Sequence, residues 1–146
     1  MLREDWTSGV QWEYQTDGQI PADFQKISAQ VNVKTATNTR LELTATGNLD
    51  AVSGTWEFQS PFQGMVEWTV FGPDTTTSLS LPEVSPSLMA LFPWFSRDSL
   101  TFSRTQLYDQ INSPDYQIII NSLFNPARPS SMERLEMSKM VVYPAR

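Results

Sequence analysis

The fold is decided by residues 55–74, which read TWEFQSPFQGMVEWTVFGPD. Apolar and polar residues alternate over 56–58 and again over 66–70, and in an extended chain such alternation places the apolar side chains on one face. Residues 60–64 between the two runs include Ser, Pro and Gly, which favour a turn. The stretch therefore predicts two antiparallel strands joined by a hairpin loop, and Gly72-Pro73-Asp74 predicts the end of the second strand.

The same alternation recurs along the chain, whereas helical periodicity is nearly absent. The run Ile118-Ile119-Ile120 is typical of a strand that is buried on both faces or lies at the centre of a sheet. Together these segments predict an all-β fold, a two-sheet antiparallel β-sandwich of about nine strands. No repeat or long linker divides the sequence, so residues 1–146 are expected to form a single domain. The other alternating segments are 10–14, 27–33, 41–45, 79–81 and 100–102, and the apolar run 140–143 suggests a last strand that can begin as early as residue 135.

One segment departs from the strand pattern and predicts a short helix near residues 86–92. Ser85 is a favourable N-cap, Pro86 fits the first helical position, and Pro93 would stop the helix after barely two turns. Two interpretations of its apolar side chains remain open. In the first they plug one end of the core, through Leu88, Leu91 and Phe92. In the second they form an exposed apolar knob, together with Trp94 and Phe95, that docks on a partner or a lipid.

The charge of the sequence excludes several classes of partner. Charged residues make up only 18%, and the net charge is −6, from 16 acidic and 10 basic residues. A nucleic-acid surface needs clustered Lys and Arg, whereas the basic residues here are scattered singly, so nucleic acids and anionic membranes are poor candidates. No apolar stretch approaches the roughly 20 residues that a transmembrane helix requires. The expected partners are a protein or a polysaccharide, and the oligomeric state stays open.

The missing residue types exclude several kinds of chemistry. Without Cys or His, the chain has no thiol nucleophile, no imidazole base and no His- or Cys-ligated metal site. It also lacks a serine-nucleophile elbow, a phosphate-binding glycine loop and an Asp-rich calcium loop. We therefore expect no cofactor, no metal and no enzymatic activity.

Two glutamates are the best candidates for the chemistry that remains. A Glu stands between two apolar residues five times, and Glu57 and Glu67 are the likeliest neighbours because their strands form the predicted hairpin. Such a pair is either part of a solvated sheet face or, in the alternative interpretation, a glycosidase-like pair of carboxylates. The other members of the pattern are Glu13, Glu42 and Glu136.

Tryptophans are the other candidates for ligand contact, because a flat indole can stack on a sugar. Trp12, Trp56 and Trp68 have the inward parity of their strands and are expected in the core. Trp6 and Trp94 fall in predicted loops and are therefore the better candidates for contact with a ligand or partner.

Thr-rich strands, interspersed Trp and Pro-punctuated turns are similar to those of small β-sandwich modules of bacterial envelope proteins. The missing catalytic residues and the low charge of a sequence rich in Thr, Gln and Ser favour a non-catalytic binding or structural module that is exported and presented at a bacterial cell envelope. The first residues lack the apolar core of a signal peptide, so export implies a leader that has been removed, and a cytoplasmic location stays open. The alternatives are a carbohydrate-active or carbohydrate-binding protein and a subunit that docks in a larger assembly through residues 88–95.

Overall fold

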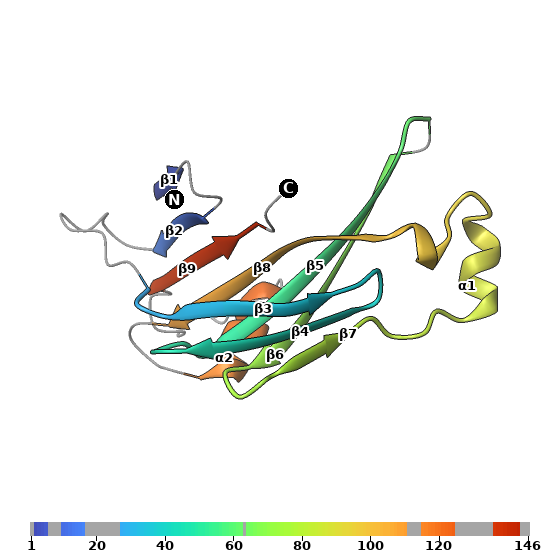
Figure 1. Ribbon diagram of the computed structural model, residues 1–146. Helices are drawn as coiled ribbons and strands as arrows, with labels where there is room; N and C mark the ends of the chain where they lie inside the picture. The colour runs from blue at the N-terminus through green and yellow to red at the C-terminus, as the bar shows by residue number, and fades with distance from the viewer. Residues whose placement is uncertain are drawn as a thin grey trace.

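The computed structural model describes residues 2–5, 10–16, 27–62, 64–110, 115–124 and 136–143 (Figure 1). These residues form mostly β-structure, with two antiparallel sheets and two short α-helices, which confirms the all-β prediction. The larger sheet comprises, in the order of pairing, β1 (Leu2–Asp5), β2 (Val10–Thr16), β9 (Glu136–Val142), β8 (Thr101–Gln110), β5 (Ala51–Ser60) and β6 (Gly64–Pro73). The smaller sheet comprises β3 (Gln30–Ala36), β4 (Arg40–Thr46) and β7 (Ser78–Ser80).

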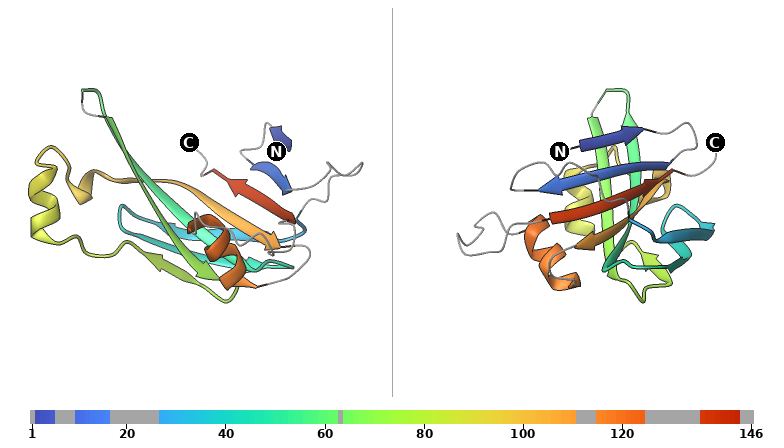
Figure 2. Two further views of the ribbon diagram at one scale, coloured as in Figure 1. Left: turned by 180° about the vertical axis from the view of Figure 1, so that it is seen from behind. Right: turned by 90° about the vertical axis from the view of Figure 1, so that its left-hand side faces the viewer.

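β5 and β6 form the hairpin that the sequence predicts. Trp56 lies opposite Trp68, Glu57 lies opposite Glu67, and the pairing closes at Gly64. Gly64 has a φ of +104°, which glycine adopts without the steric penalty that a Cβ would bring. The hairpin extends beyond the other strands (Figures 1 and 2), so its turn stands clear of the described remainder of the chain.

The two sheets share one apolar core. Both contribute to its largest fully buried side chains, which include Leu41, Leu43, Val52, Trp56 and Leu107. Trp56 Nε1 donates a hydrogen bond to the carbonyl oxygen of Thr37 at 2.8 Å, and the indole meets Phe102 edge to face, with ring centroids 5.7 Å apart. The indole therefore joins the larger sheet to the loop between β3 and β4, and the prediction that Trp56 is a core residue is confirmed.

An irregularity in β8 changes which side chains face the core. Trp56 is paired with Phe102, but the preceding Thr55 is paired with Arg104, so Ser103 is an extra residue in the strand. In a regular strand, residues 102 and 104 would share a face. The bulge instead directs Phe102 into the core and Arg104 to the opposite face of the larger sheet.

The expectation of a strand at 118–120 is wrong, because these residues lie in α2 (Tyr116–Phe124). The carboxylate of Asp115 accepts a hydrogen bond from a backbone N–H of the first turn at 2.7 Å, which stabilises the start of the helix. Ile119 is buried against Ala51 and Tyr108, on the face of the larger sheet that is turned away from the main core. This packing outweighs the modest preference of isoleucine for strands.

The short helix near residues 86–92 is confirmed as α1 (Pro86–Leu91). Ser85 caps it, since its Oγ accepts a hydrogen bond from the N–H of Leu88 at 3.3 Å, and Pro86 occupies the first turn.

The expectation that this helix plugs the core is wrong. Leu88, Leu91 and Phe92 are 47%, 70% and 43% exposed, and α1 has no buried residue. The chain between β7 and β8 runs past the end of the sheets before it turns back (Figure 1), so α1 lies beside the hairpin rather than over the core. Phe95 and Leu100, which are 8% and 1% exposed, fill the core at this end instead.

Candidate apolar binding site

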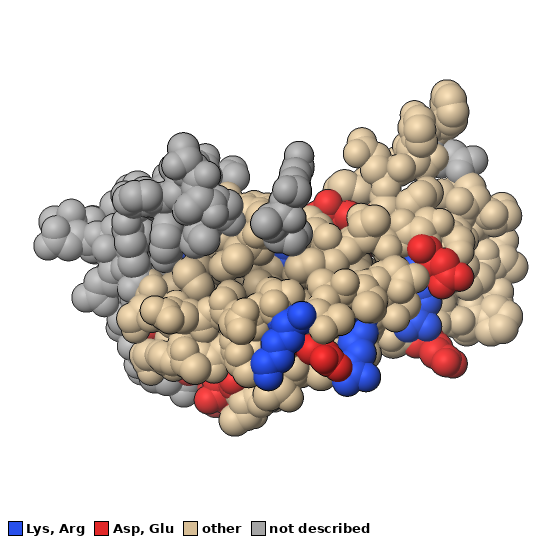
Figure 3. Space-filling view, viewed as in Figure 1, with Lys and Arg blue, Asp and Glu red and all other residues tan. Residues whose placement is uncertain are grey.

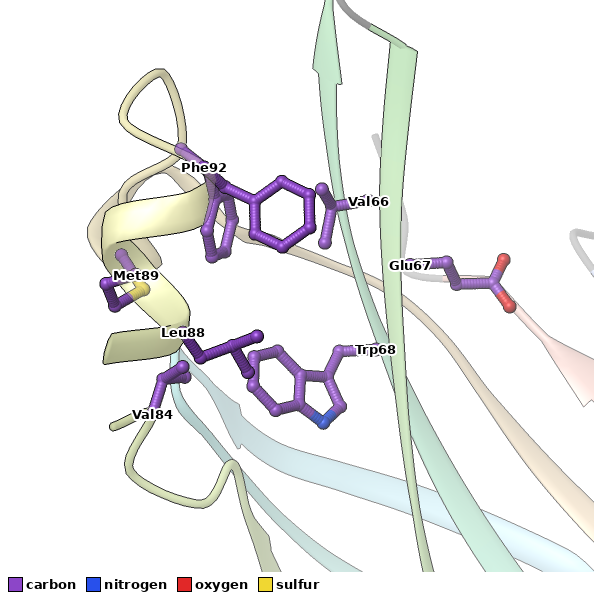
Figure 4. A pocket seen from close by; sticks show the side chains of 8 residues that line it. Val66, Glu67, Trp68, Val84, Leu88, Met89 and Phe92 are labelled. Carbon is purple, nitrogen blue, oxygen red and sulfur yellow. The ribbon is translucent and has the colours of Figure 1, made fainter. Parts of the chain in front are cut away.

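An apolar pocket of about 240 Å³ lies between α1 and β6. It is lined by Val66, Glu67, Trp68, Val84, Leu88, Met89, Phe92 and Phe95. Val66 and Trp68 project from β6 toward α1, whereas the carboxylate of Glu67 points away (Figure 4). Because side chains alternate along a strand, β6 gives the pocket an apolar wall and keeps its charge on the other face.

Aromatic packing holds the chain that follows α1 against the hairpin. Trp94 stacks on Phe58 of β5 at a centroid distance of 6.2 Å and meets Phe92 edge to face at 6.0 Å. These separations lie in the range where aromatic pairs attract one another. The Nη2 of Arg97 donates a hydrogen bond to the carbonyl oxygen of Leu81 at 2.6 Å, which ties together the two ends of the segment that carries α1. These contacts fasten the segment that carries α1 to the hairpin and to Leu81.

Exposed apolar side chains also lie at the tip of the β5–β6 hairpin. Phe62 is 94% and Met65 is 61% exposed at the tip. Figure 3 shows charged side chains in the middle and lower parts of one face, while the projecting tip carries none. Clustered exposed apolar residues typically mark interaction sites.

The residues predicted to contact a ligand or partner have different surroundings. Phe95 is buried and lines the pocket from the core side. Trp94 is half-buried within the aromatic cluster. Trp6 lies outside the described residues. Contact of any of the three with a partner therefore stays a prediction. Leu88 and Met89 of α1 belong to the segment 88–95 that the sequence offered as a docking contact, whereas Val66 of β6 is a pocket residue that the sequence did not single out.

Glu57 and Glu67 are direct neighbours, as the predicted hairpin requires, but Arg104 lies between them. One nitrogen of its guanidinium pairs with Glu57 Oε1, and the other lies 2.8 Å from Glu67 Oε2. Burial lowers the pKa of Arg104, but hydrogen bonds and charge from the two glutamates outweigh it and raise that pKa above its usual value. The group is an ionic bridge across β6, β5 and β8.

Removal of this bridge is expected to destabilise the hairpin. In an Arg104→Met variant, two carboxylates face each other across adjacent strands without a counter-charge, and we expect a loss of about 1–2 kcal/mol in the free energy of unfolding. Urea denaturation followed by circular dichroism measures the loss. Adding Glu57→Gln and Glu67→Gln to the same variant should restore most of it, and a single variant as stable as the wild type would contradict the assignment.

A cluster of three buried polar side chains lies next to this bridge on the same face of the larger sheet: Ser53, Gln106 and Tyr108. Ser53 and Tyr108 both lie within hydrogen-bond distance of Gln106 Oε1, at 3.4 and 2.9 Å. Burial raises the pKa of Tyr108 to about 12, so its hydroxyl stays protonated and can donate. Farther along, Lys139 Nζ pairs with Glu13 at 2.7 Å. The hydrogen bonds give the buried polar atoms partners and link β5 to β8, and the ion pair links β2 to β9.

The described ranges contain no group of three or more acidic side chains that could hold a metal ion. Likewise, none of the helices described has the length and apolar character needed to cross a membrane. Comparison of the chain with known proteins gives no matching family model, no matching curated protein and no matching solved structure.

Proposed function

We propose that this protein is a non-catalytic binding module that receives an apolar group of a partner in the pocket between α1 and β6. The observation that carries the proposal is the apolar lining of this pocket beside the exposed side chains of α1. Sites that bind ligands are typically concave, largely apolar and preformed. In this reading the protein docks on a larger assembly through residues 88–95, and the partner buries leucine and phenylalanine side chains that now face solvent.

The pocket can be tested with the neutral apolar dye N-phenyl-1-naphthylamine, whose fluorescence rises when it leaves water. The dye should bind the wild type, and Leu88→Asp should weaken binding at least about tenfold, because a charge in an apolar pocket lacks a partner. Leu91→Asp is the matched control, since Leu91 is exposed on the same helix but does not line the pocket. It should change the affinity less than about twofold. Equal effects of the two substitutions, or no binding to the wild type, would contradict the proposal.

The wider setting of the module is part of the same proposal. The two sheets form a β-sandwich of about nine strands, a single domain over residues 1–146, presented in a bacterial cell envelope or secreted. The shared core supports the sandwich, and the low proportion of charged residues supports export. Recovery of the native protein in the cytoplasmic fraction of its cell would contradict the location.

The glutamate pair favours a structural role over carbohydrate chemistry. The proximity of Glu57 and Glu67 is what a carbohydrate-active protein would need. However, Arg104 already occupies the space between the two carboxylates and pairs with one oxygen of each. We therefore assign the pair to the ionic bridge, and the Arg104 variants test this assignment.

A further inference from the structure

Beside the pocket, the outer edge of β6 is paired with none of the strands that the structure describes. Among the described strands, β6 pairs only with β5 and ends the order of the larger sheet. In an antiparallel edge strand, every second residue turns its N–H and C=O away from the single neighbour. Proteins usually protect such edges with charges, prolines or bulges. Along β6 the protection is slight, because Pro73 lies at its end and Glu67 is its single charge.

The direction of the side chains links this edge to the pocket. Val66 and Trp68 point toward α1, whereas Glu67 points to the other face of the hairpin (Figure 4). A strand added beside β6 would alternate in the same way. Every second side chain would then lie on the side where α1 and the pocket are, and the intervening side chains would lie beside Glu67.

We propose that β6 accepts an extended segment of a partner protein as an additional strand, with an apolar side chain in the pocket and basic side chains next to Glu67. This proposal rests on the proposed function and specifies the chemistry of the partner. Addition of a strand to a sheet edge combines backbone hydrogen bonds, which give affinity, with a pocket for alternate side chains, which gives specificity.

Charge complementarity identifies the polar side chains of the partner. Glu57 and Glu67 carry two negative charges and Arg104 one positive charge, so the ionic bridge has a net charge of −1. The whole chain has a net charge of −6, which also favours a basic partner. Lys or Arg on a strand directly opposite Glu67 would form a favourable cross-strand pair.

The test uses the heptapeptide acetyl-TLKVKLT-amide, in which apolar and basic side chains alternate. Two further versions carry N-methyl groups on the amides of Leu and Val or on those of Lys, and each removes the central donors along one edge of the extended peptide. Titration calorimetry measures binding to the wild type. We expect one version to lose at least about tenfold in affinity and the other to stay within about twofold of the parent, because only one edge of the peptide faces β6.

Charge exchange tests the side of the peptide that faces Glu67. Glu67→Lys should weaken binding of the parent peptide about fivefold, and acetyl-TLEVELT-amide should then bind this variant better than it binds the wild type. Glu42→Lys is the matched control, since it makes the same change of charge on the smaller sheet. If Glu67→Lys unfolds, Glu67→Gln replaces it, with an expected loss of about twofold.

The outcomes separate this proposal from the proposed function. Equal effects of the two N-methylated versions, or failure of the parent peptide to bind while the naphthylamine dye still enters the pocket, would overturn strand addition and leave the pocket as a binding site. Equal effects of Glu67→Lys and Glu42→Lys would overturn the charge assignment. Failure of the dye to bind would overturn the proposed function itself.

Discussion

Replacement of Trp56 with alanine is expected to lower the free energy of unfolding by about 4 kcal/mol. The indole is fully buried, meets Phe102 edge to face and donates its N–H to the Thr37 carbonyl. Its removal leaves a cavity in the core that both sheets share, because the surrounding strands are held in register and cannot close over it. Equilibrium unfolding in urea, followed by circular dichroism, gives the value.

Trp56→Phe is the control for this experiment. It keeps most of the apolar volume but loses the hydrogen bond to the carbonyl oxygen of Thr37. The expected loss is about 1–2 kcal/mol. Equal losses for the alanine and phenylalanine variants would show that the hydrogen bond, rather than packing, accounts for the role of Trp56.

Gly47→Ala is expected to destabilise the protein by about 3 kcal/mol, for two separate reasons. Gly47 has a φ of +97°, which an L-residue with a Cβ adopts only with strain. A Cβ at this position would also lie 2.8 Å from Cα of Ala29, a backbone atom of a buried residue that cannot easily move. The same urea denaturation measures the loss.

Gly64→Ala separates the two contributions to the loss at Gly47. Gly64 also has a positive φ, +104°, but a Cβ there would meet nothing within 4 Å. We therefore expect a loss of about 1–2 kcal/mol from backbone strain alone. If Gly47→Ala proves no more destabilising than Gly64→Ala, the close approach of Ala29 has no energetic consequence.

Strands with a long alternation of apolar and polar residues could be predicted from the sequence. The hairpin formed by β5 and β6 is the clearest case, because alternation and turn residues both specify the same pairing. The run at 118–120 is different, since three consecutive isoleucines have no periodicity that distinguishes a strand from a helix. Its helical state is decided by packing on Ala51 and Tyr108, which lie far away in the sequence.

The candidate site was predictable only in part. Ser85 and Pro86 mark the start of α1, but an apolar helix that plugs a core and one that stays exposed have the same sequence pattern. Arg104 was not identified because nothing in the sequence marks Ser103 as a bulged residue, and without the bulge Arg104 would share a face with Phe102. The ionic bridge thus depends on a shift of strand register, which alternation alone does not reveal.

That single extra residue in β8 also affects the mechanics of the hairpin. Arg104 forms ion pairs with Glu57 of β5 and Glu67 of β6. These pairs lie on the face of β6 opposite to the one that carries Val66 and Trp68 into the pocket. The guanidinium therefore supports β6 from the face opposite the pocket. Beyond these ion pairs, the hairpin extends without a neighbouring strand among those described, as far as Phe62. The extra residue Ser103 in β8 thus determines the point along the β5–β6 hairpin at which Arg104 holds the two strands together.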